Sequence, residues 1–308
     1  MLLNEEKNGK ILFGKCCDDW LEFKKNLIKE SSYFNYKFAV EKHIKPVLGK
    51  KTLEELMQYD MNQFIKIKKQ QGITSSLKEI LVRVKSILRY VKRRYGINYD
   101  LDFKLGYVAN IEDLEVFNEK EIQKLYKYII TSDDIRNIGI LICLYSGLRI
   151  GEVCGLKWRD IDLENKEIFV KRTVQRLYRG KKQKSELIVT LPKTKCSMRR
   201  IPISKVLIEK LRKIKNNYSE DCFVITGSPY KHYEPLTYRH VYKQLLKQCK
   251  IPYKKFHCLR HTFATKCIRV GMDTKSLSEV LGHSNIGTTM NIYVHSNYDV
   301  KKKYIDRL

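Results

Sequence analysis

Six residues in the second half of the chain have side chains that together suit chemistry at a phosphodiester. In chain order they are Arg149, Lys193, His257, Arg260, His283 and Tyr293. A tyrosine hydroxyl has an ordinary pKa of about 10 and is a weak nucleophile on its own. Cations around a phosphate and proton donors beside it would make attack by tyrosine feasible, and the set contains both. The ordered set therefore suggests cleavage of a nucleic-acid strand through a phosphotyrosine.

Arg149 lies in the segment LYSGLRIGEVCGLKWRDIDL, three residues before Glu152. On a helix, residues at this spacing share a face, so the carboxylate would hold the guanidinium in a fixed orientation. An arginine held in this way is suited to bind a phosphate through two parallel hydrogen bonds. Any arginine and glutamate at this spacing can also form an ordinary surface ion pair, so the pair alone is weakly diagnostic.

The segment HCLRH places His257 and Arg260 on one helical face, where they would provide a group that titrates near neutrality and a phosphate clamp. In LGHSNIGTTMNIY, Gly282 is expected to end a helix before His283, and a new helix would present Tyr293. A surface histidine and a half-buried core tyrosine are the ordinary alternatives, because the chain contains 20 tyrosines.

The charge of the chain indicates a polyanionic partner. Lys and Arg number 61 against 34 Asp and Glu, which gives a formal net charge of +27. Release of counterions from phosphates drives binding of such proteins to nucleic acid. The sequence has no apolar run near the roughly 18 residues that a membrane span needs, and no signal-peptide pattern. We therefore expect double-stranded DNA as the partner, no membrane, and a cytoplasmic, nucleoid-associated location.

The nine cysteines do not predict a metal centre. They are scattered along the chain, two are adjacent, and none forms a C-x-x-C pair, so a zinc site has little support. We expect reduced, mostly buried thiols and no bound metal.

The first hundred residues predict helices over about 13–29, 33–44 and 77–95, with a stop at Pro46 and Gly49 after the second. Ser76 and Glu79 have the spacing of a capping box. Seven apolar residues then repeat at helical spacing: Leu77, Ile80, Leu81, Val84, Ile87, Leu88 and Val91. A solvated face would explain the cations opposite them, but the excess charge favours phosphate contact by Lys78, Arg83, Lys85, Arg89 and Lys92.

Residues 97–116 lose the helical period and predict a linker between two domains. A helix is expected to start at Asn118, with Glu121 at capping distance, and an apolar segment over 135–148 to follow. Between about 165 and 203, β-branched residues predict a small antiparallel sheet, and 223–226 a possible further strand. We expect the basic turn in this region to be an exposed hairpin that contacts DNA through Arg179, Lys181 and Lys182. Helices are expected again over 237–249, 258–270, 274–281 and about 286–295.

Four motifs together resemble the tyrosine recombinase (phage integrase) family. They are RIGE after an apolar helix, PKTK before a strand, HCLRHTFAT, and LGHSNIGTTMNIY, and the resemblance extends over nearly the whole chain from about residue 12. It implies a helical core-binding, DNA-clamping domain over 1–100, a linker over 101–116, and a catalytic domain over 117–308 that ends in a C-terminal tail. The catalytic domain would be mixed and mainly helical, with a small antiparallel sheet.

The resemblance also implies a role for each candidate residue. Arg149 and Arg260 would hold the non-bridging oxygens of the scissile phosphate. Tyr293 would be the nucleophile, which leaves a 3′-phosphotyrosyl link and a free 5′-hydroxyl. Lys193 would protonate the leaving 5′-oxygen, and Lys195, two residues further on, is the competing assignment.

The remaining groups would assist this step. His257 would take part in proton transfer, His283 would hydrogen-bond the phosphate, and Glu152 would orient the groups that touch it. No metal, nucleotide or other cofactor is implied, because the phosphotyrosine conserves the energy of the phosphodiester and the cations supply positive charge.

Two features differ from larger members of the family. Only about a dozen residues precede the core-binding helices, so we expect the domain that binds arm-type DNA sites to be absent. The tail after Tyr293 is short and is expected to pack on a neighbouring subunit. The partners implied are a homotetramer on DNA and accessory DNA-bending or directionality factors.

The leading function is site-specific recombination, with integration and excision of a mobile element as its purpose. DNA inversion or dimer resolution would use the same chemistry. A type IB topoisomerase is an alternative enzyme, which the short segment from His283 to Tyr293 and the helical N-terminal domain disfavour. A non-catalytic DNA-binding relative is the alternative of a different class, but no catalytic residue type is missing.

Overall fold

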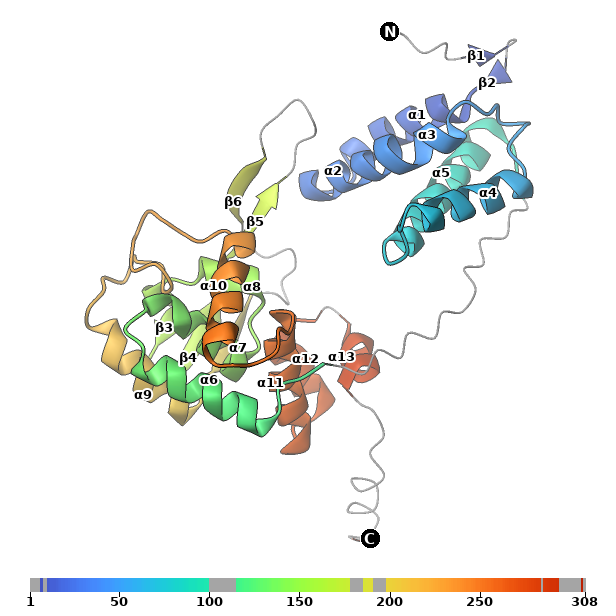
Figure 1. The fold of residues 1–308 in the computed structure, drawn as a ribbon. Coiled ribbons are helices and arrows are strands. Elements are labelled where there is room, and N and C mark those ends of the chain that lie inside the picture. The colour runs from blue at the N-terminus through green and yellow to red at the C-terminus, as the bar shows by residue number, and fades with distance from the viewer. Residues whose placement is uncertain are drawn as a thin grey trace. The chain divides into compact units, whose positions relative to one another are not determined.

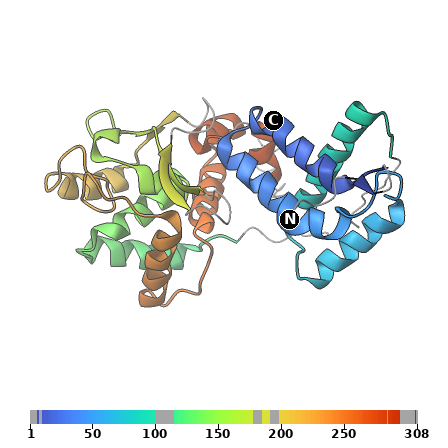
Figure 2. The same cartoon turned by 90° about the horizontal axis from the view of Figure 1, so that it is seen from above.

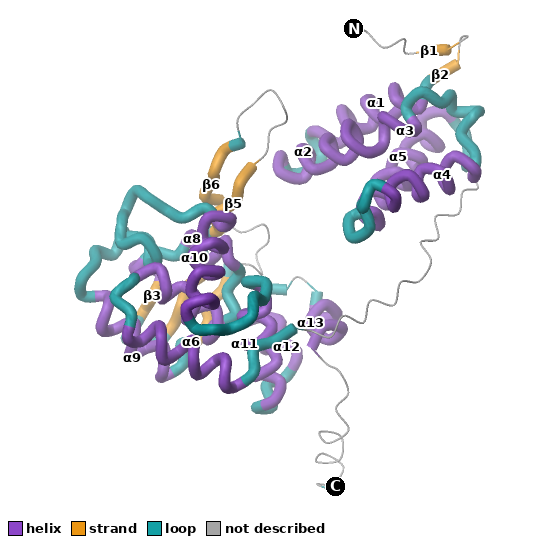
Figure 3. Tube along the Cα trace, viewed as in Figure 1, coloured by secondary structure: helices purple, strands orange, loops and turns teal. Residues whose placement is uncertain are grey.

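The computed structural model describes residues 6–7, 10–99, 115–177, 185–190, 198–283, 285–293 and 306 (Figure 1). The chain forms two compact units, the first over Met1–Asn110 with Leu177–Glu186 and the second over Ile111–Arg176 and Leu187–Leu308. Helices account for most of both units, as Figure 3 shows in purple. Of the expected linker over 97–116, the structure describes residues 97–99 and 115–116, and the rest falls outside the described residues.

The first unit is a helical bundle, whose elements run from blue to teal in Figures 1 and 2. Two short strands, β1 (Glu6–Lys7) and β2 (Lys10–Ile11), pair antiparallel ahead of it. The helical elements are α1 (Phe13–Lys25), α2 (Glu30–Ala39), the π-helical turn η1 (Val40–Ile44), α3 (Lys45–Leu48), α4 (Gln58–Gln70) and α5 (Leu77–Tyr95).

Helix α5 has the predicted bounds and the predicted apolar face. All seven of its predicted core residues are buried, in one cluster with Phe13, Trp20 and Phe64. The predicted capping box is wrong, since among the described residues the Ser76 side chain makes no capping hydrogen bond. The Ser76 backbone (φ −89°, ψ −6°) is near-helical, whereas an N-cap residue normally has an extended backbone. Glu79 instead pairs with Arg83 at 3.3 Å, one turn further along the helix.

Of the helix stop predicted at Pro46 and Gly49, Gly49 is confirmed as the end of the helix and Pro46 is wrong. The helical path continues from α2 through the π-helical turn η1 into α3 and ends at Gly49. Proline has no N–H and its ring clashes with the carbonyl of the preceding turn in a regular α-helix. Here Pro46 falls in the first turn of α3, where no backbone donor is required. The wider turn of η1 makes this change of helix possible.

The second unit contains helices on either side of its short strands in the chain. They are α6 (Glu119–Thr131), α7 (Ile138–Ser146), α8 (Ile150–Gly155), α9 (Lys205–Lys215), α10 (Pro235–Gln248), α11 (His257–Arg269), α12 (Thr274–Leu281) and α13 (Ile286–Tyr293). The predicted capping box of α6 is confirmed, since the Glu121 N–H donates to Asn118 at 2.9 Å and Glu121 accepts from the Asn118 N–H at 2.8 Å. Helix α9 was not predicted, although its apolar residues have helical spacing.

The strands form two sheets rather than the single sheet expected. β3 (Ile161–Asp162), β4 (Glu167–Val170) and β7 (Arg199–Pro202) make an antiparallel sheet in that order, and β5 (Thr173–Leu177) pairs with β6 (Glu186–Thr190). Between β4 and β5 the Arg172 guanidinium bonds to Asp160 and to the Gly155 carbonyl. These contacts draw the chain away from the first sheet, so β5 does not continue it.

The possible strand over 223–226 is wrong as well. Phe223 makes one isolated bridge with Lys157, and the N–H groups of Thr226 and Gly227 then donate to the Phe223 carbonyl. Gly227 has a φ of +64°, so the segment is a turn, and its apolar side chains are buried by the helices around it.

Helix α7 lies at the centre of the second unit and is buried along almost its whole length. It packs against α11, and α12 packs against α11, α13 and β7. This arrangement brings the C-terminal ends of α7 and α12 and the N-terminal end of α11 together beside the start of α8. No helix in the described part of the chain is both long and apolar enough to cross a membrane.

Candidate active site

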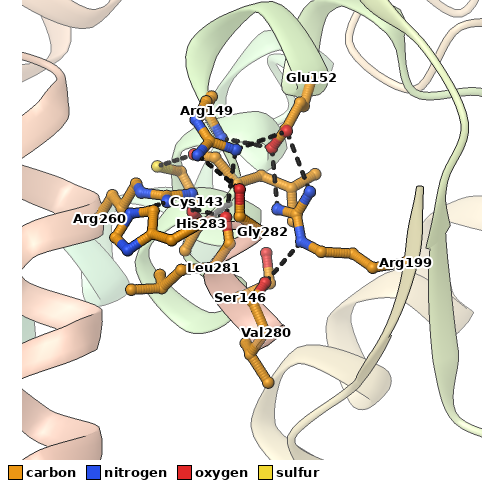
Figure 4. Close-up of polar contacts among 12 residues, drawn as sticks. Cys143, Ser146, Arg149, Glu152, Arg199, Arg260, Val280, Leu281, Gly282 and His283 are labelled. Atoms are coloured by element: carbon orange, nitrogen blue, oxygen red, sulfur yellow. Dashed lines mark hydrogen bonds and ion pairs between the residues drawn. The ribbon is translucent and has the colours of Figure 1, made fainter. Parts of the chain in front are cut away.

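Arg149, His257, Arg260 and His283 come together in the second unit, from three separate segments of the chain, since His257 and Arg260 both lie on α11. Arg149 and Arg260 donate to the same carbonyl, that of Leu281, at 3.1 and 2.8 Å. Arg260 also lies 2.8 Å from His283, between Arg Nη2 and His Nε2 (Figure 4). His257 is near enough for the charges of both arginines to lower its pKa.

Arg149 stands at the N-terminus of α8, immediately after a sharp turn. Gly147 ends α7 with a φ of +67°, and a Cβ there would lie only 2.6 Å from the Phe263 ring. The backbone N–H of Arg149 donates to Glu152 Oε2 at 2.8 Å, and its Nη1 donates to Oε1 at 3.1 Å. The predicted Arg–Glu pair therefore forms as a cap of the helix, which fixes the backbone and the guanidinium together.

The C-terminus of α12 orients both arginines. Arg149 donates through Nη1 to the Leu281 carbonyl and through Nη2 to the Gly282 carbonyl at 3.0 Å. Arg260 is only 1% exposed, and its guanidinium donates to the carbonyls of Leu281 and Gly147. Helix C-terminal carbonyls lack helical partners and carry partial negative charge, so they stabilise two neighbouring guanidinium groups. Gly282 (φ +66°) ends α12 as predicted.

Arg199, at the start of β7, belongs to the same cluster although it was not predicted. Its Nη1 and Nη2 donate to the two oxygens of Glu152, both at 3.0 Å, and its Nε donates to the Val280 carbonyl at 2.6 Å. The residue is 8% exposed. The alternation of inward and outward side chains along β7 could have identified Arg199 from the sequence. Arg199 and Ile201 occupy inward positions of the strand, and Arg200 occupies an outward one.

His283 is neutral in this arrangement, and its tautomer follows from its partners. Arg260 can only donate, so His283 Nε2 accepts, and Nδ1 carries the proton and donates to Thr289 Oγ1 at 2.8 Å. Burial, followed by the positive charges of Arg260, Arg149 and Arg199, lowers the pKa of His283 to about 4. The hydrogen bond to Thr289 attaches α13 to the cluster.

His257 begins α11 and lies edge-to-face with His261, at 4.5 Å between ring centroids. The residue as a whole is exposed, but desolvation of its ring, followed by the charges of His261 and Arg260, lowers its pKa to about 4. The imidazole is therefore neutral at ordinary pH, which is the state that a general base needs before it takes up a proton.

Several predicted residues lie wholly or partly outside the described part of the chain. Lys193 and Lys195 fall within residues 191–197, and the hairpin residues Arg179, Lys181 and Lys182 within 178–184. For Tyr293 the structure describes the backbone, as the last residue of α13. Position 293 is four residues, about one helical turn, beyond Thr289 along α13.

The predicted cations of α5 divide into two groups. Lys78, Lys85, Arg89 and Lys92 are exposed and follow one another at spacings of seven, four and three residues, so they form one stripe on the face away from the core. Arg83 lies off this stripe. It is half-buried, pairs with Glu79 and stacks on the Tyr36 ring at 5.1 Å.

Eight cysteines fall in the described residues, and all eight are buried free thiols, as expected. Burial raises the pKa of the thiols of Cys16 and Cys267 to about 11, which makes them poor nucleophiles.

Comparisons with known proteins agree with these features. A model of the phage integrase family matches residues 115–299, and a model of the phage integrase N-terminal SAM-like domain matches residues 12–68. Among curated proteins, a tyrosine recombinase XerC-like protein of Caldanaerobacter subterraneus is 35% identical over 201 residues, which cover 59% of this chain and 51% of that protein. The Tn916 transposase of Enterococcus faecalis is 32% identical over 184 residues, 55% of this chain and 44% of the relative. The chain thus spans about half the length of these two relatives.

Solved structures show the same fold. The Tn1549 transposon integrase in complex with a circular intermediate DNA superimposes with a TM-score of 0.78 at 21% identity, over 96% of this chain and 99% of that one. A lambda integrase tetramer bound to a Holliday junction superimposes with a TM-score of 0.66 at 17% identity, over 94% of this chain and 80% of that one.

Proposed function

The chain belongs to the phage integrase family, and we propose that it is a site-specific DNA recombinase that cuts and rejoins DNA through a 3′-phosphotyrosyl intermediate. One observation carries this proposal. Arg149, Arg260 and His283 converge at the C-terminus of α12, and α13, which contacts His283 through Thr289, ends at Tyr293. Phosphate-binding groups and a tyrosine thus belong to adjoining elements of one unit.

The charge of the cluster suits a single phosphate. The cluster contains three guanidinium groups, of Arg149, Arg199 and Arg260, and one carboxylate, that of Glu152, which bonds to Arg149 and Arg199. His257 and His283 are neutral at ordinary pH. The excess positive charge would stabilise the negative charge that grows on the phosphate during attack. Phosphate oxygens would also form stronger, charge-assisted bonds with Arg149 and Arg260 than the carbonyls of α12 do. We therefore propose catalysis without a metal or nucleotide cofactor.

In the proposed step, the Tyr293 oxygen attacks the scissile phosphorus and the bond from phosphorus to the 5′-oxygen breaks. His257 assists removal of the tyrosine proton, and Lys193, or Lys195 in its place, gives a proton to the departing 5′-oxygen. Attack of a 5′-hydroxyl on the phosphotyrosine reverses the step and rejoins the strand. Glu152 holds Arg149, and His283 donates a hydrogen bond to the phosphate once its proton has moved to Nε2 or a second proton has bound.

We further propose a role for each part of the chain. Residues 1–100 would clamp DNA through the stripe on α5, and residues 117–308 would carry the chemistry, with the hairpin residues Arg179, Lys181 and Lys182 as additional phosphate contacts. Double-stranded DNA would be bound by a homotetramer, with accessory DNA-bending or directionality factors. The protein would act in the cytoplasm, on the nucleoid. The relatives named as transposon proteins favour integration and excision of a mobile element over inversion or dimer resolution.

A nicked duplex from the DNA that borders the gene tests the proposal. A nick just beyond the cleaved bond lets the short 5′-hydroxyl strand dissociate, so a covalent protein–DNA adduct should accumulate. Two such sites placed on one plasmid should then exchange strands. Relaxation of the plasmid without exchange would favour a type IB topoisomerase, and DNA binding without any adduct would favour the non-catalytic alternative.

A further inference from the structure

We propose that Arg199 is a positioning residue of the proposed strand-cleavage reaction, which holds Glu152 and the end of α12 in place so that Arg149 is presented to the phosphate. The inference rests on the proposed function, since it assigns a role within that reaction. Its basis is geometric: one buried guanidinium, from a strand outside the recognised motifs, joins the two segments that orient both of the clamping arginines.

The first contact of Arg199 is with Glu152. Each oxygen of this carboxylate accepts two hydrogen bonds: Oε1 from Arg149 Nη1 (3.1 Å) and Arg199 Nη1 (3.0 Å), and Oε2 from the Arg149 N–H (2.8 Å) and Arg199 Nη2 (3.0 Å). The acceptor capacity of the carboxylate is thereby filled. Without Arg199, Glu152 would be left to pair with Arg149 alone and would draw that guanidinium away from a phosphate.

The second contact of Arg199 is with the end of α12. Its Nε donates to the Val280 carbonyl at 2.6 Å, next to the Leu281 and Gly282 carbonyls that bind Arg149 and Arg260. Gly282 leaves room for the guanidinium, since a Cβ there would lie 3.0 Å from Arg199 Nη1. Only arginine offers a planar group that can donate to both carboxylate oxygens and to a carbonyl together.

Arg199 also affects the ionisation of Glu152. The charged and titratable groups that face Glu152 are Arg149 at the start of α8, Arg199 on β7, and the Cys143 thiol on α7. Burial alone would raise the pKa of Glu152, but the hydrogen bonds and charge of Arg199, with the charge of Arg149, hold it below its ordinary value. Loss of Arg199 removes the larger of these contributions, so the pKa of Glu152 should rise.

The test compares Arg199→Met with Arg199→Lys and with Arg200→Met as a matched control. Arg200 is the next residue of β7, but its side chain is 69% exposed and pairs with Glu167 at the surface. Adduct formation on the nicked duplex is measured in single turnovers across pH, together with DNA affinity and the thermal midpoint of each variant.

For Arg199→Met we expect a rate loss on the order of 100-fold, as for a misplaced catalytic group, with DNA affinity little changed. The acid limb of its pH–rate profile should move to higher pH, because Glu152 becomes protonated as pH falls through its raised pKa. Arg199→Lys should be intermediate, and Arg200→Met should match wild type in rate and profile. In a Glu152→Gln background, Arg199→Met should cost far less than it does in wild type.

The double variant also guards against misfolding, because replacing both partners of a buried ion pair leaves no unpaired charge. An Arg199→Lys enzyme with the wild-type rate and acid limb would overturn the inference, as would an undiminished Arg199→Met loss in the Glu152→Gln background. No adduct with the wild-type protein would instead refute the proposed function itself, so the two failures are distinguishable.

Discussion

At the scale of single residues, the proton on His283 decides what this side chain can do at a phosphate. In the structure His283 Nδ1 carries the proton and donates to Thr289, while Nε2 accepts from Arg260. A hydrogen bond from His283 Nε2 to a phosphate therefore requires a second proton or a change of tautomer. Binding of an anion would favour the former, since it offsets the positive charges that now lower the pKa of His283.

The depressed pKa values of His257 and His283 predict a loss of stability in acid. Both pKa values are about 4, below the ordinary histidine pKa of about 6.5. Between pH 4 and pH 6.5 these histidines bind more protons in the unfolded chain than in the folded one. Their contribution to folding stability is therefore fully present above about pH 6.5 and is lost as the pH falls toward 4. Urea midpoints measured across this range should fall, and less so for His283→Gln. An equally steep fall in that variant would contradict the assignment of His283.

Arg260→Lys should separate chemistry from binding. Lysine keeps a positive charge but cannot donate in the planar pattern by which Arg260 holds Gly147, Leu281 and His283 together. We expect adduct formation to fall on the order of 100-fold or more. DNA affinity should change little, because it is spread over many phosphates. A large loss of affinity with an unchanged rate of adduct formation would argue against the proposed role.

Site residues that stand in strong local motifs were predictable from the sequence, but the contacts that orient their side chains were not. Arg149, His257, Arg260 and His283 stand in recognisable motifs, and the structure brings them together. The chain order does not reveal that the carbonyls at the end of α12 orient both arginines. Arg199 was missed because its partners, Glu152 and Val280, are 47 and 81 residues away in the chain.

At the scale of elements, the end of α12 joins the cluster to β7. Gly282→Ala should be compared with Gly271→Ala, because both glycines have positive φ (+66° and +91°) but nothing lies within 4 Å of a Cβ at Gly271. Each substitution should cost about 1–2 kcal/mol of stability for the left-handed backbone. Gly282→Ala should cost more, measured by urea unfolding, and should also slow adduct formation, since it displaces Arg199. Equal effects of the two would contradict the arrangement described at Gly282.

The stripe on α5 predicts a change in the salt dependence of DNA binding. Replacing Lys78, Lys85, Arg89 and Lys92 by Gln should reduce the slope of log affinity against log salt by roughly 3 to 4, if each contacts a phosphate. Arg83→Gln is the matched control on the same helix, since Arg83 lies off the stripe and is held by Glu79 and Tyr36. A similar change of slope in Arg83→Gln and in the fourfold variant would argue against a DNA-contacting stripe.

Elements with a strong apolar period were predictable, and those set by tertiary context were not. The period of α5 matched its buried face residue for residue. The path through Pro46 depends on the π-helical turn before it, and the turn at 223–226 is apolar because helices cover it. The division of the strands into two sheets depends on Arg172 reaching back to Asp160, a contact that a local pattern does not encode.

At the scale of the whole molecule, the sequence gives a net charge of +27, and its loss of helical period over 97–116 predicts two domains. The charge predicts a polyanionic partner, which stays a prediction, and the motifs predicted the family that the match over residues 115–299 shows. The target sequence in DNA was not predictable, since phosphate contacts supply most of the affinity and carry no sequence information directly.

The most direct test is to identify the residue that becomes linked to DNA. The adduct formed on the nicked duplex is digested with trypsin, and the nucleotide-bearing peptide is sequenced by mass spectrometry. The expected peptide, residues 276–301, contains both Tyr293 and Tyr298, so fragmentation must separate the two, and Tyr298→Phe serves as the control. We predict a phosphonucleotide on Tyr293, no adduct with Tyr293→Phe, and a normal adduct with Tyr298→Phe. A nucleotide on any other residue, or an undiminished adduct with Tyr293→Phe, would contradict the central claim.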